Sequence, residues 1–318
     1  MTIALVSAAV IFALVNGVNT GAALLAMAIR TDYVSPLLCL VVMVGGVFIA
    51  PYVFGTAVAT TLAVELVDSN RVAAQAGMLT AVLVAIVVVG VLSMIRVPTS
   101  LTLSLVGAIA GFGWAFGENV QWWIVLKVLG MMAIAPMFGG LGAALFTRVI
   151  APLLRSRDAG RFLKGFHALA FAFMSLSYGA NDAQKMLAVF AVATGVTAGA
   201  VPAIGWQVAL CSALFGVGSF VGVGRMSRTL GTGVLLSRPL DVVSAEISTA
   251  AAMLVSTSAA SSVGLGQALS GSLIGSGLAQ GLRRVRWREV SRIVMAWAAT
   301  LPASLALSAT AGWLVSRA

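Results

Sequence analysis

Long apolar runs, separated by short polar or charged breaks, make up almost the whole sequence. The runs lie near residues 3–29, 34–64, 72–95, 98–117, 120–150, 164–200, 203–224, 240–258, 260–282 and 290–315. A membrane-spanning helix needs about 20 such residues, and no run alternates with the period of two that is typical of a membrane β-barrel. Several runs exceed one crossing, so broken or re-entrant helices are expected within them. The pattern predicts an all-α polytopic membrane protein with about ten transmembrane helices.

The composition agrees with a chain that lies in a lipid bilayer. Of the 318 residues, 60% are hydrophobic and 9% are charged, whereas a soluble domain has roughly 25% charged residues. A chain this poor in charge cannot cover a soluble fold with polar surface, which excludes an ordinary soluble enzyme, a disordered protein and a secreted disulfide scaffold. Cys39 and Cys211 both lie within apolar runs, where they indicate neither a disulfide framework nor a metal site.

The formal net charge is +10, and most of the 19 basic residues fall in three breaks, at 148–164, 225–238 and 283–292. With ten crossings these breaks share one side with Arg30 and Arg96. The positive-inside rule makes that side cytoplasmic, so the sequence predicts a multi-pass protein of the cytoplasmic (inner) membrane with both termini outside. No basic face with interleaved aromatic residues accompanies the charge, which argues against a nucleic-acid partner.

Two sequence matches at nearly one offset indicate an internal repeat. The segment Asn16-Gly17-Val18-Asn19-Thr20-Gly21 is similar to Tyr178-Gly179-Ala180-Asn181-Asp182-Ala183, at an offset of 162. Three glycines, Gly107, Gly111 and Gly113, recur as Gly271, Gly275 and Gly277, at an offset of 164. The predicted repeats are residues 1–157 and 158–318. Five spans in each would invert the second repeat relative to the first, as in many secondary transporters.

Charged side chains inside a bilayer are costly and therefore call for a function or a partner. Asp182 and Lys185 lie within the run 164–200 and share one helix face at spacing i, i+3. They could simply neutralise each other and fix the packing of helices. Alternatively, a helix break after Gly179-Ala180 would turn Asn181 and Asp182 toward a cavity as ligands for Na⁺ or H⁺, with Lys185 balancing the charge of a substrate. Their first-half counterparts are Asn19 and Thr20, which could also be interhelical hydrogen-bonding residues.

Two glycine-rich helix starts are candidates for binding an anion. Thr99, Ser100 and Thr102 follow a proline, and hydroxyls with free backbone N–H groups suit an oxyanion, although they could equally be ordinary helix caps. The matching stretch offers a backbone that can approach a ligand closely, at Gly264, Gly266 and Gln267.

The remaining candidate functional residues are one acid and one histidine. Glu246 is a candidate cation or proton ligand, or an acid at a helix N-terminus. His167 stands alone at a predicted cytoplasmic end, where a histidine is more often an interfacial residue than a proton relay. No nucleotide-binding loop, catalytic cluster or metal-ligand cluster occurs, so we expect neither an enzyme nor a cofactor beyond a coupling ion.

The segment Tyr178–Lys185, with its Gly-Ala-Asn-Asp followed by Gln-Lys, resembles the second signature of the PiT-type inorganic phosphate transporters. The resemblance covers nearly the whole chain and extends to Ser244-Ala245-Glu246 and to Trp287–Pro302. Thr20 stands where the family's first signature has Asp, and the family's paired Pro-x-Ser-Thr-Thr-His segments correspond to Pro98–Leu103 and Ser262–Gln267, without the His. In the family these segments and the Asn-Asp motifs line the anion and cation sites.

The resemblance implies a secondary transporter of inorganic phosphate, coupled to H⁺ or Na⁺, that works by alternating access. Asn181 and Asp182, with Na⁺ as one possible ion, would form the cation site together with Asn19, Thr20 and Glu246. The alternatives are a permease for another oxyanion such as sulfate, and a non-transporting membrane sensor or accessory subunit. The sequence leaves open whether the chain forms a homo-oligomer.

Overall fold

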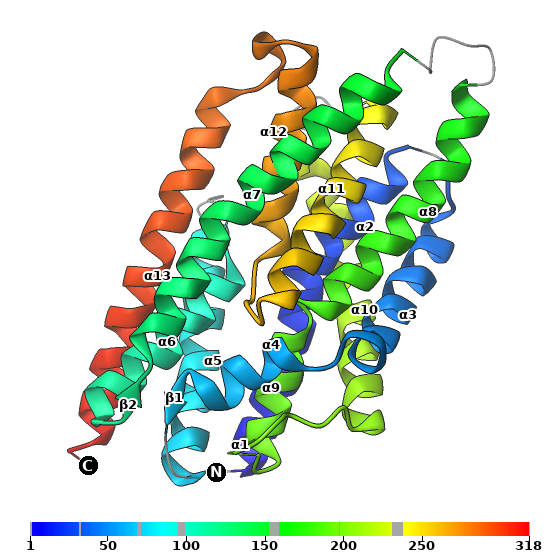
Figure 1. Cartoon of the computed structure of the whole chain (residues 1–318). Coiled ribbons are helices and arrows are strands. Elements are labelled where there is room, and N and C mark those ends of the chain that lie inside the picture. The colour runs from blue at the N-terminus through cyan, green and yellow to red at the C-terminus, as the bar shows by residue number, and fades with distance from the viewer. Residues whose placement is uncertain are drawn as a thin grey trace.

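The computed structural model describes residues 2–31, 33–68, 71–94, 99–152, 159–196, 198–230 and 238–317, and these are nearly all helical (Figure 1). The elements follow the order α1 (Thr2–Asn16), η1 (Gly17–Gly21), α2 (Ala22–Ile29), α3 (Pro36–Phe54), α4 (Ala57–Thr60), η2 (Thr61–Glu65), β1 (Val67–Asp68), α5 (Arg71–Met94), α6 (Leu101–Phe116), β2 (Asn119–Val120), α7 (Trp122–Ile150), α8 (Ala159–Ala180), α9 (Gln184–Ala193), α10 (Gly205–Leu230), α11 (Pro239–Ser258), α12 (Leu265–Gln280), η4 (Leu282–Arg284) and α13 (Trp287–Val315). Here η1 and η2 are π-helical, and β1 and β2 form a short antiparallel pair.

Seven helices in the described part of the chain are long and apolar enough to cross a membrane. They are Thr2–Ile29, Pro36–Phe54, Ala73–Leu92, Trp122–Ile150, Gly205–Gly224, Pro239–Ser258 and Trp287–Val315. The chain is therefore a multi-pass membrane protein. By contrast, α6 and α12 have 16 residues each, or about 24 Å at 1.5 Å per residue, less than the roughly 30 Å of a hydrocarbon core. The expectation of ten full spans thus stays a prediction.

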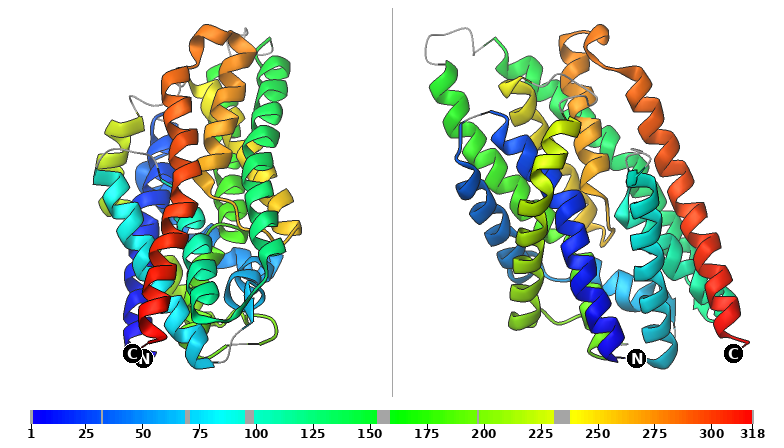
Figure 2. Two further views of the ribbon diagram at one scale, coloured as in Figure 1. Left: turned by 90° about the vertical axis from the view of Figure 1, so that its left-hand side faces the viewer. Right: turned by 180° about the vertical axis from the view of Figure 1, so that it is seen from behind.

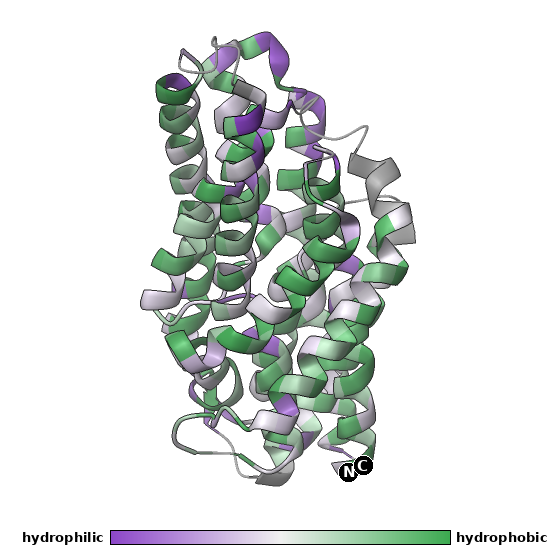
Figure 3. Cartoon of the chain, turned by 90° about the vertical axis from the view of Figure 1, so that its right-hand side faces the viewer, coloured by the Kyte–Doolittle hydropathy of each residue, from purple (hydrophilic) through white to green (hydrophobic). Residues whose placement is uncertain are grey.

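The two termini lie at one end of the bundle, and the connection between α12 and α13 lies at the other (Figures 1 and 2). That second end, called here the basic end, carries η4 with Arg283 and Arg284. Figure 3 shows hydrophilic residues gathered there and hydrophobic residues along most of the helices. Arg96, which the charge pattern placed on this side, lies outside the described residues.

Glycines let two pairs of helices approach so closely that backbone meets backbone. These contacts join Gly107 to Leu301, Gly111 to Leu305, Gly271 to Pro136 and Gly275 to Gly140. At each glycine an added Cβ would lie 1.9–2.7 Å from the partner's carbonyl oxygen, which is closer than atoms can pack. Small residues at such crossings are typical of helices in membranes. The α6–α13 and α7–α12 crossings therefore use glycines at the same offset, 164, as the sequence match.

The helix α9 lies at the centre of the bundle, since all ten of its residues are buried. It continues the direction of α8 after a short turn at residues 181–183. The starts of α6 and α12 reach this turn, and the connection that precedes α12, residues 259–264, turns back inside the bundle (Figure 1). This arrangement brings a helix break and two helix N-termini together in the interior.

Candidate functional site

The helix break between α8 and α9 forms where the sequence offers the smallest side chains. Gly179 packs against α3, where an added Cβ would lie 2.6 Å from the carbonyl oxygen of Gly46. After Ala180 the chain leaves the helix for a turn, in which the N–H of Ala183 donates to the carbonyl of Tyr178 at 3.1 Å. The opening expected after Gly179-Ala180 is therefore present, and it places polar groups in the core of the bundle.

The carboxylate of Asp182 connects the break to both helix starts. Its Oδ1 accepts a hydrogen bond from Thr102 Oγ1 of α6 at 2.9 Å and forms an ion pair with Lys185 Nζ. Its Oδ2 accepts from the backbone N–H of Leu265, the first residue of α12, at 3.2 Å. Lys185 Nζ also donates to Thr102 Oγ1 at 3.1 Å. Asp182 and Lys185 are 1% and 0% exposed, so the two charges neutralise each other in the interior, as the helix-packing interpretation expects.

Asn181 holds the connection between α11 and α12. Its Nδ2 donates to the carbonyl of Ser261 at 2.9 Å and to Thr257 Oγ1 at 3.0 Å, and its Oδ1 accepts from the N–H of Val263 at 2.8 Å. These bonds occupy the amide protons and one lone pair of Oδ1. One oxygen lone pair is thus left for a cation, and the side chain's main effect is to fix the loop before α12.

The two predicted anion-binding starts lie against each other. Ser100 caps α6 by accepting from the N–H of Leu103 at 3.3 Å. An added Cβ on Gly264 would lie 3.2 Å from Ser100 Oγ and 3.6 Å from Thr102 Oγ1. Gln267 Oε1 accepts from the N–H of Gly264 at 3.3 Å, within its own helix start.

Gly266 is the exception among the predicted anion ligands. It is exposed, with no atom within 4 Å of where a Cβ would stand. It therefore lies outside the group that the other residues form.

Three buried hydroxyls at the helix starts have no hydrogen-bond partner. They belong to Thr99, Ser261 and Ser262. Buried polar groups are nearly always hydrogen-bonded, so an unpaired one calls for an explanation such as a ligand. Ser261 was not among the residues that the sequence singled out, because it precedes the motif-like stretch. These hydroxyls lie at the N-termini of α6 and α12, where the helix dipole favours negative charge.

The first-half motif has a different local structure from the second. Asn19 is half-buried and Thr20 is buried, and both lie in the π-helix η1, whose main neighbour is α10. The helix continues through η1, whereas the second-half motif breaks it. The two motifs meet where Asn16 Nδ2 donates to the Tyr178 hydroxyl at 2.9 Å, a contact between positions that the repeat match makes equivalent.

Glu246 lies away from this site. It is fully buried on α11, eleven residues before Thr257, which contacts Asn181; at 1.5 Å per residue this is about 16 Å. Its partner is His167 of α8, with Nδ1 and Oε2 2.9 Å apart. His167, expected as an interfacial residue, is 0% exposed and buried between helices. The apolar run around it gave no sign of the partner on another helix.

Gln184 also contributes to the site, although the sequence did not single it out as a candidate ligand. Its Oε1 accepts from the N–H of Ala59 at 2.9 Å, and its Nε2 donates to the carbonyl of Gly55 at 2.9 Å. The side chain thus ties the start of α9 to the start of α4. Its place in the Asn-Asp-Ala-Gln-Lys segment was the available signal.

Taken together, the site offers hydroxyl and N–H donors, one ammonium group and one carboxylate, without a cluster of three metal-ligating acids, histidines or cysteines among the described residues. The carboxylate oxygens of Asp182 could bind an alkali cation or a proton. The hydroxyl groups at the two helix starts could donate hydrogen bonds to an oxyanion.

Comparisons with known proteins point in the same direction. A sequence model described as the phosphate transporter family matches residues 16–161 and 154–308. A probable low-affinity inorganic phosphate transporter of Mycobacterium leprae (strain TN) is 31% identical over 82% of this chain and 65% of that protein. One from Mycobacterium tuberculosis (strain ATCC 25618 / H37Rv) is 32% identical over 78% and 61%. The chain thus spans less than two thirds of the length of these relatives.

Other similar proteins match the chain from end to end. A probable low-affinity inorganic phosphate transporter of Rhizobium meliloti (strain 1021) is 27% identical over 97% of this chain and 95% of that protein. Among solved structures, the sodium-dependent phosphate transporter superposes with a TM-score of 0.85 over 99% of this chain and 98% of that one, at 20% identity. This likeness shows a shared fold.

Proposed function

Because the chain belongs to the phosphate transporter family, we propose that it is a secondary transporter of inorganic phosphate in the cytoplasmic membrane. The observation that carries the proposal is the junction at Asp182, where a broken helix meets the N-termini of α6 and α12. The names of the relatives, all inorganic phosphate transporters, support phosphate as the substrate. The protein is then a transporter without catalytic chemistry or a cofactor, apart from a coupling ion.

Phosphate binds, in this proposal, between the starts of α6 and α12. The unpaired hydroxyls of Thr99, Ser261 and Ser262 donate to its oxygens, and the positive ends of the two helix dipoles favour its negative charge. Lys185 does not contact the phosphate directly in this proposal; its ammonium group donates to Thr102 at the start of α6 and so places a positive charge near the anion. Because Asp182 already balances Lys185, the anion's charge is met chiefly by neutral donors.

The coupling ion is H⁺ or Na⁺. Asp182, with the free lone pair of Asn181 Oδ1, is the candidate cation site of the second half. A Na⁺ ion there would compete with the Lys185 ammonium for the same carboxylate. Asn19 and Thr20 are the first-half counterparts and offer no carboxylate, so the two halves would contribute unequally.

Alternating access would proceed by rocking of two inverted repeats, residues 1–157 and 158–318. The matched glycine contacts at the α6–α13 and α7–α12 crossings support this architecture. The Asn16–Tyr178 hydrogen bond supports it too, because a contact between equivalent residues is expected at a two-fold pseudo-axis. The basic end is then cytoplasmic and both termini face outward.

Uptake of labelled phosphate by liposomes that contain the purified full chain tests the proposal. We expect uptake above that of empty liposomes, and weaker competition by sulfate than by unlabelled phosphate. Stronger competition by sulfate would identify a sulfate permease instead. Absence of uptake, together with absence of thermal stabilisation by phosphate, would identify a sensor or accessory subunit.

Ser262→Ala tests the anion site itself. The hydroxyl has no partner without substrate, so its removal should leave the melting temperature unchanged. A hydrogen bond to a charged group contributes about 1.5–3 kcal/mol, so KM for phosphate should rise about tenfold or more. The matched control is Ser258→Ala, an exposed serine of α11. An unchanged KM would remove Ser262 from the site.

A further inference from the structure

A second buried polar group, the His167–Glu246 pair, lies toward the basic end, away from the anion site. His167 Nδ1 and Glu246 Oε2 are 2.9 Å apart, and both side chains are 0% exposed. His167 Nε2 lies 3.2 Å from the carbonyl oxygen of Ala28, in the last turn of α2. The pair thus joins α2, α8 and α11 by side-chain contacts.

The hydrogen-bond geometry fixes how many protons this pair holds. The Ala28 carbonyl can only accept, so Nε2 must carry a hydrogen. Nδ1 and the carboxylate oxygen would repel each other at 2.9 Å unless one proton lies between them. That proton belongs either to an imidazolium facing a carboxylate or to a carboxylic acid facing a neutral imidazole. Both forms have the same proton count and no net charge, and loss of the proton would leave a bare negative charge in the interior.

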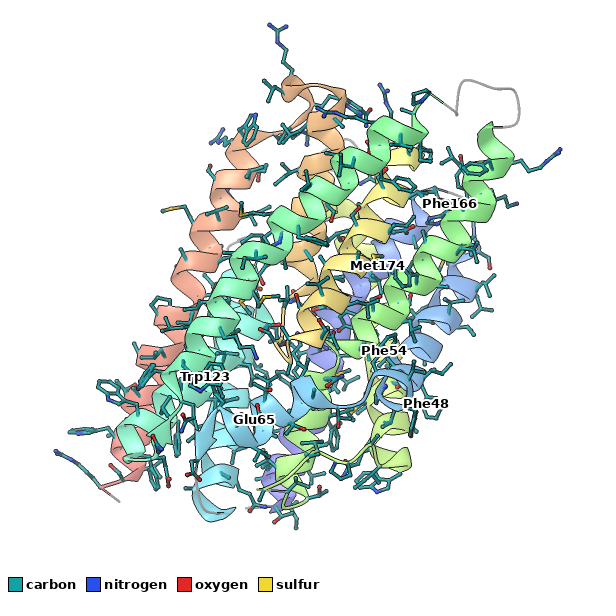
Figure 4. All side chains as sticks on the ribbon, viewed as in Figure 1. Phe48, Phe54, Glu65, Trp123, Phe166 and Met174 are labelled. Carbon is teal, nitrogen blue, oxygen red and sulfur yellow. The ribbon has the colours of Figure 1, made fainter. Side chains whose placement is uncertain are left out.

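The surroundings seal the proton from water in this conformation. Residues next to the pair along α8 and α11 belong to one apolar cluster: Leu163, Ala170, Val243, Tyr33, Phe146, Phe166 and Ile247. Figure 4 shows Phe166 near the basic end of α8 and Met174 farther into the bundle, and His167 follows Phe166 directly. With both side chains fully buried, the shared proton has no contact with water in this conformation.

Few other titratable groups face the pair. The ring of Tyr33 lies 6.2 Å from the His167 ring, centroid to centroid, and Cys39 of α3 is within electrostatic reach of Glu246. On the pair's own helices, Lys164 of α8 is exposed, and Asp241 of α11 is paired with Arg284. Among the described residues, Glu246 is the one acid that meets His167. Its second oxygen, Oε1, is buried without a partner, which leaves room for a water molecule or a further donor once the site opens.

The pair sits on α8 and α11, whose far ends lead into residues next to the proposed anion site. The far end of α8 leads into Asn181 and Asp182, and the far end of α11 carries Thr257, which Asn181 contacts. A movement that opens the basic end for phosphate release must pull on the same helices. Buried chains of His and acidic residues in membranes commonly carry protons.

We propose that His167 and Glu246 form a proton-binding site that couples phosphate movement to proton movement and exchanges its proton at the basic end. The inference rests on the proposed transport of phosphate and names H⁺ as the coupling ion. Na⁺ is then not required for accumulation of substrate.

The test compares exchange with net accumulation in liposomes that contain the full chain. Exchange of labelled for unlabelled phosphate moves no net proton, whereas accumulation driven by a pH gradient does. In the wild type, a gradient of about one pH unit should give about tenfold accumulation per coupled proton. Glu246→Gln and His167→Gln keep hydrogen-bonding groups but cannot bind the shared proton. They should retain exchange and lose gradient-driven accumulation.

Glu289→Gln is the matched control, because Glu289 lies on α13 near the same end and is partly exposed. It should accumulate phosphate like the wild type. Gradient-driven accumulation by both pair variants would overturn the inference. Failure of exchange in the wild type would instead overturn the proposed function.

A second measurement tests proton coupling in the wild type alone, so it does not depend on whether a variant folds. A pH-sensitive dye inside wild-type liposomes should report acidification as phosphate enters. Phosphate entry without proton entry, or accumulation that requires a Na⁺ gradient, would overturn the proton site.

Discussion

Replacement of Asp182 by asparagine should destabilise the protein far more than the loss of one side-chain charge suggests. Asn is nearly the same size, but its single carbonyl oxygen can replace only one carboxylate oxygen, so it can accept from Thr102 or from the N–H of Leu265 and not from both. It leaves the Lys185 ammonium buried, 0% exposed, without a counter-charge on its described hydrogen-bond partners. Breaking a buried ion pair by removing one partner costs about 3–5 kcal/mol, because the other charge is left uncompensated.

Replacement of Lys185 should lower the free energy of unfolding less than replacement of Asp182. In Lys185→Met the carboxylate of Asp182 keeps two donors, Thr102 Oγ1 and the Leu265 N–H at the positive end of α12. We expect a loss of about 1–3 kcal/mol. The double variant, Asp182→Asn with Lys185→Met, carries no buried charge and should therefore be more stable than Asp182→Asn alone.

Thermal unfolding of the purified protein in detergent measures the series. At roughly 2 °C per kcal/mol for a chain of this length, Asp182→Asn should lower the melting temperature by roughly 6–10 °C. Asp68→Asn, the same change at an exposed position of β1, is the matched control and should shift it by no more than about 1 °C. Additive losses of melting temperature in the double variant would show that the two charges do not stabilise each other.

Two further predictions concern packing and the contact between the motifs. Gly275→Ala should destabilise the protein by about 1–3 kcal/mol, because its Cβ would lie 1.9 Å from the Gly140 carbonyl oxygen. The control Gly130→Ala, whose Cβ would have no atom within 4 Å, should not destabilise it. Coinciding melting curves of the two variants in detergent would contradict this prediction. Tyr178→Phe removes the acceptor of Asn16 Nδ2 and should cost about 1–3 kcal/mol. Asn16→Leu with Tyr178→Phe should recover part of that loss, and no recovery in melting temperature would show that the hydrogen bond is unimportant.

Much of the fold could be predicted from the hydrophobic pattern. The apolar runs correspond to helices within a few residues, for example 240–258 to α11 and 120–150 to α7. The number of crossings could not be predicted, because a run such as 98–117 has the composition of a full span while only 16 of its residues form helix. Composition reports that a segment avoids water but not how deep in the bilayer it ends.

The site was partly predictable for a related reason. The cost of buried charge singled out Asp182 and Lys185, and both lie at the junction. The partners could not be foreseen, because the contacts to Thr102 and Leu265 cross 80 or more residues of sequence. The same holds for Glu246, which the sequence grouped with the cation ligands and the structure pairs with His167. Residue type indicates that a buried acid such as Glu246 needs a partner. Only the packing of α8 on α11 shows that this partner is His167.

In the proposed transporter, phosphate binds between the starts of α6 and α12. An experimental structure of the protein with phosphate bound would locate the anion. We expect phosphate within hydrogen-bond distance of the Thr99 and Ser262 hydroxyls, beside the Asp182–Lys185 pair. Phosphate at another place, with these hydroxyls still unpaired, would contradict it.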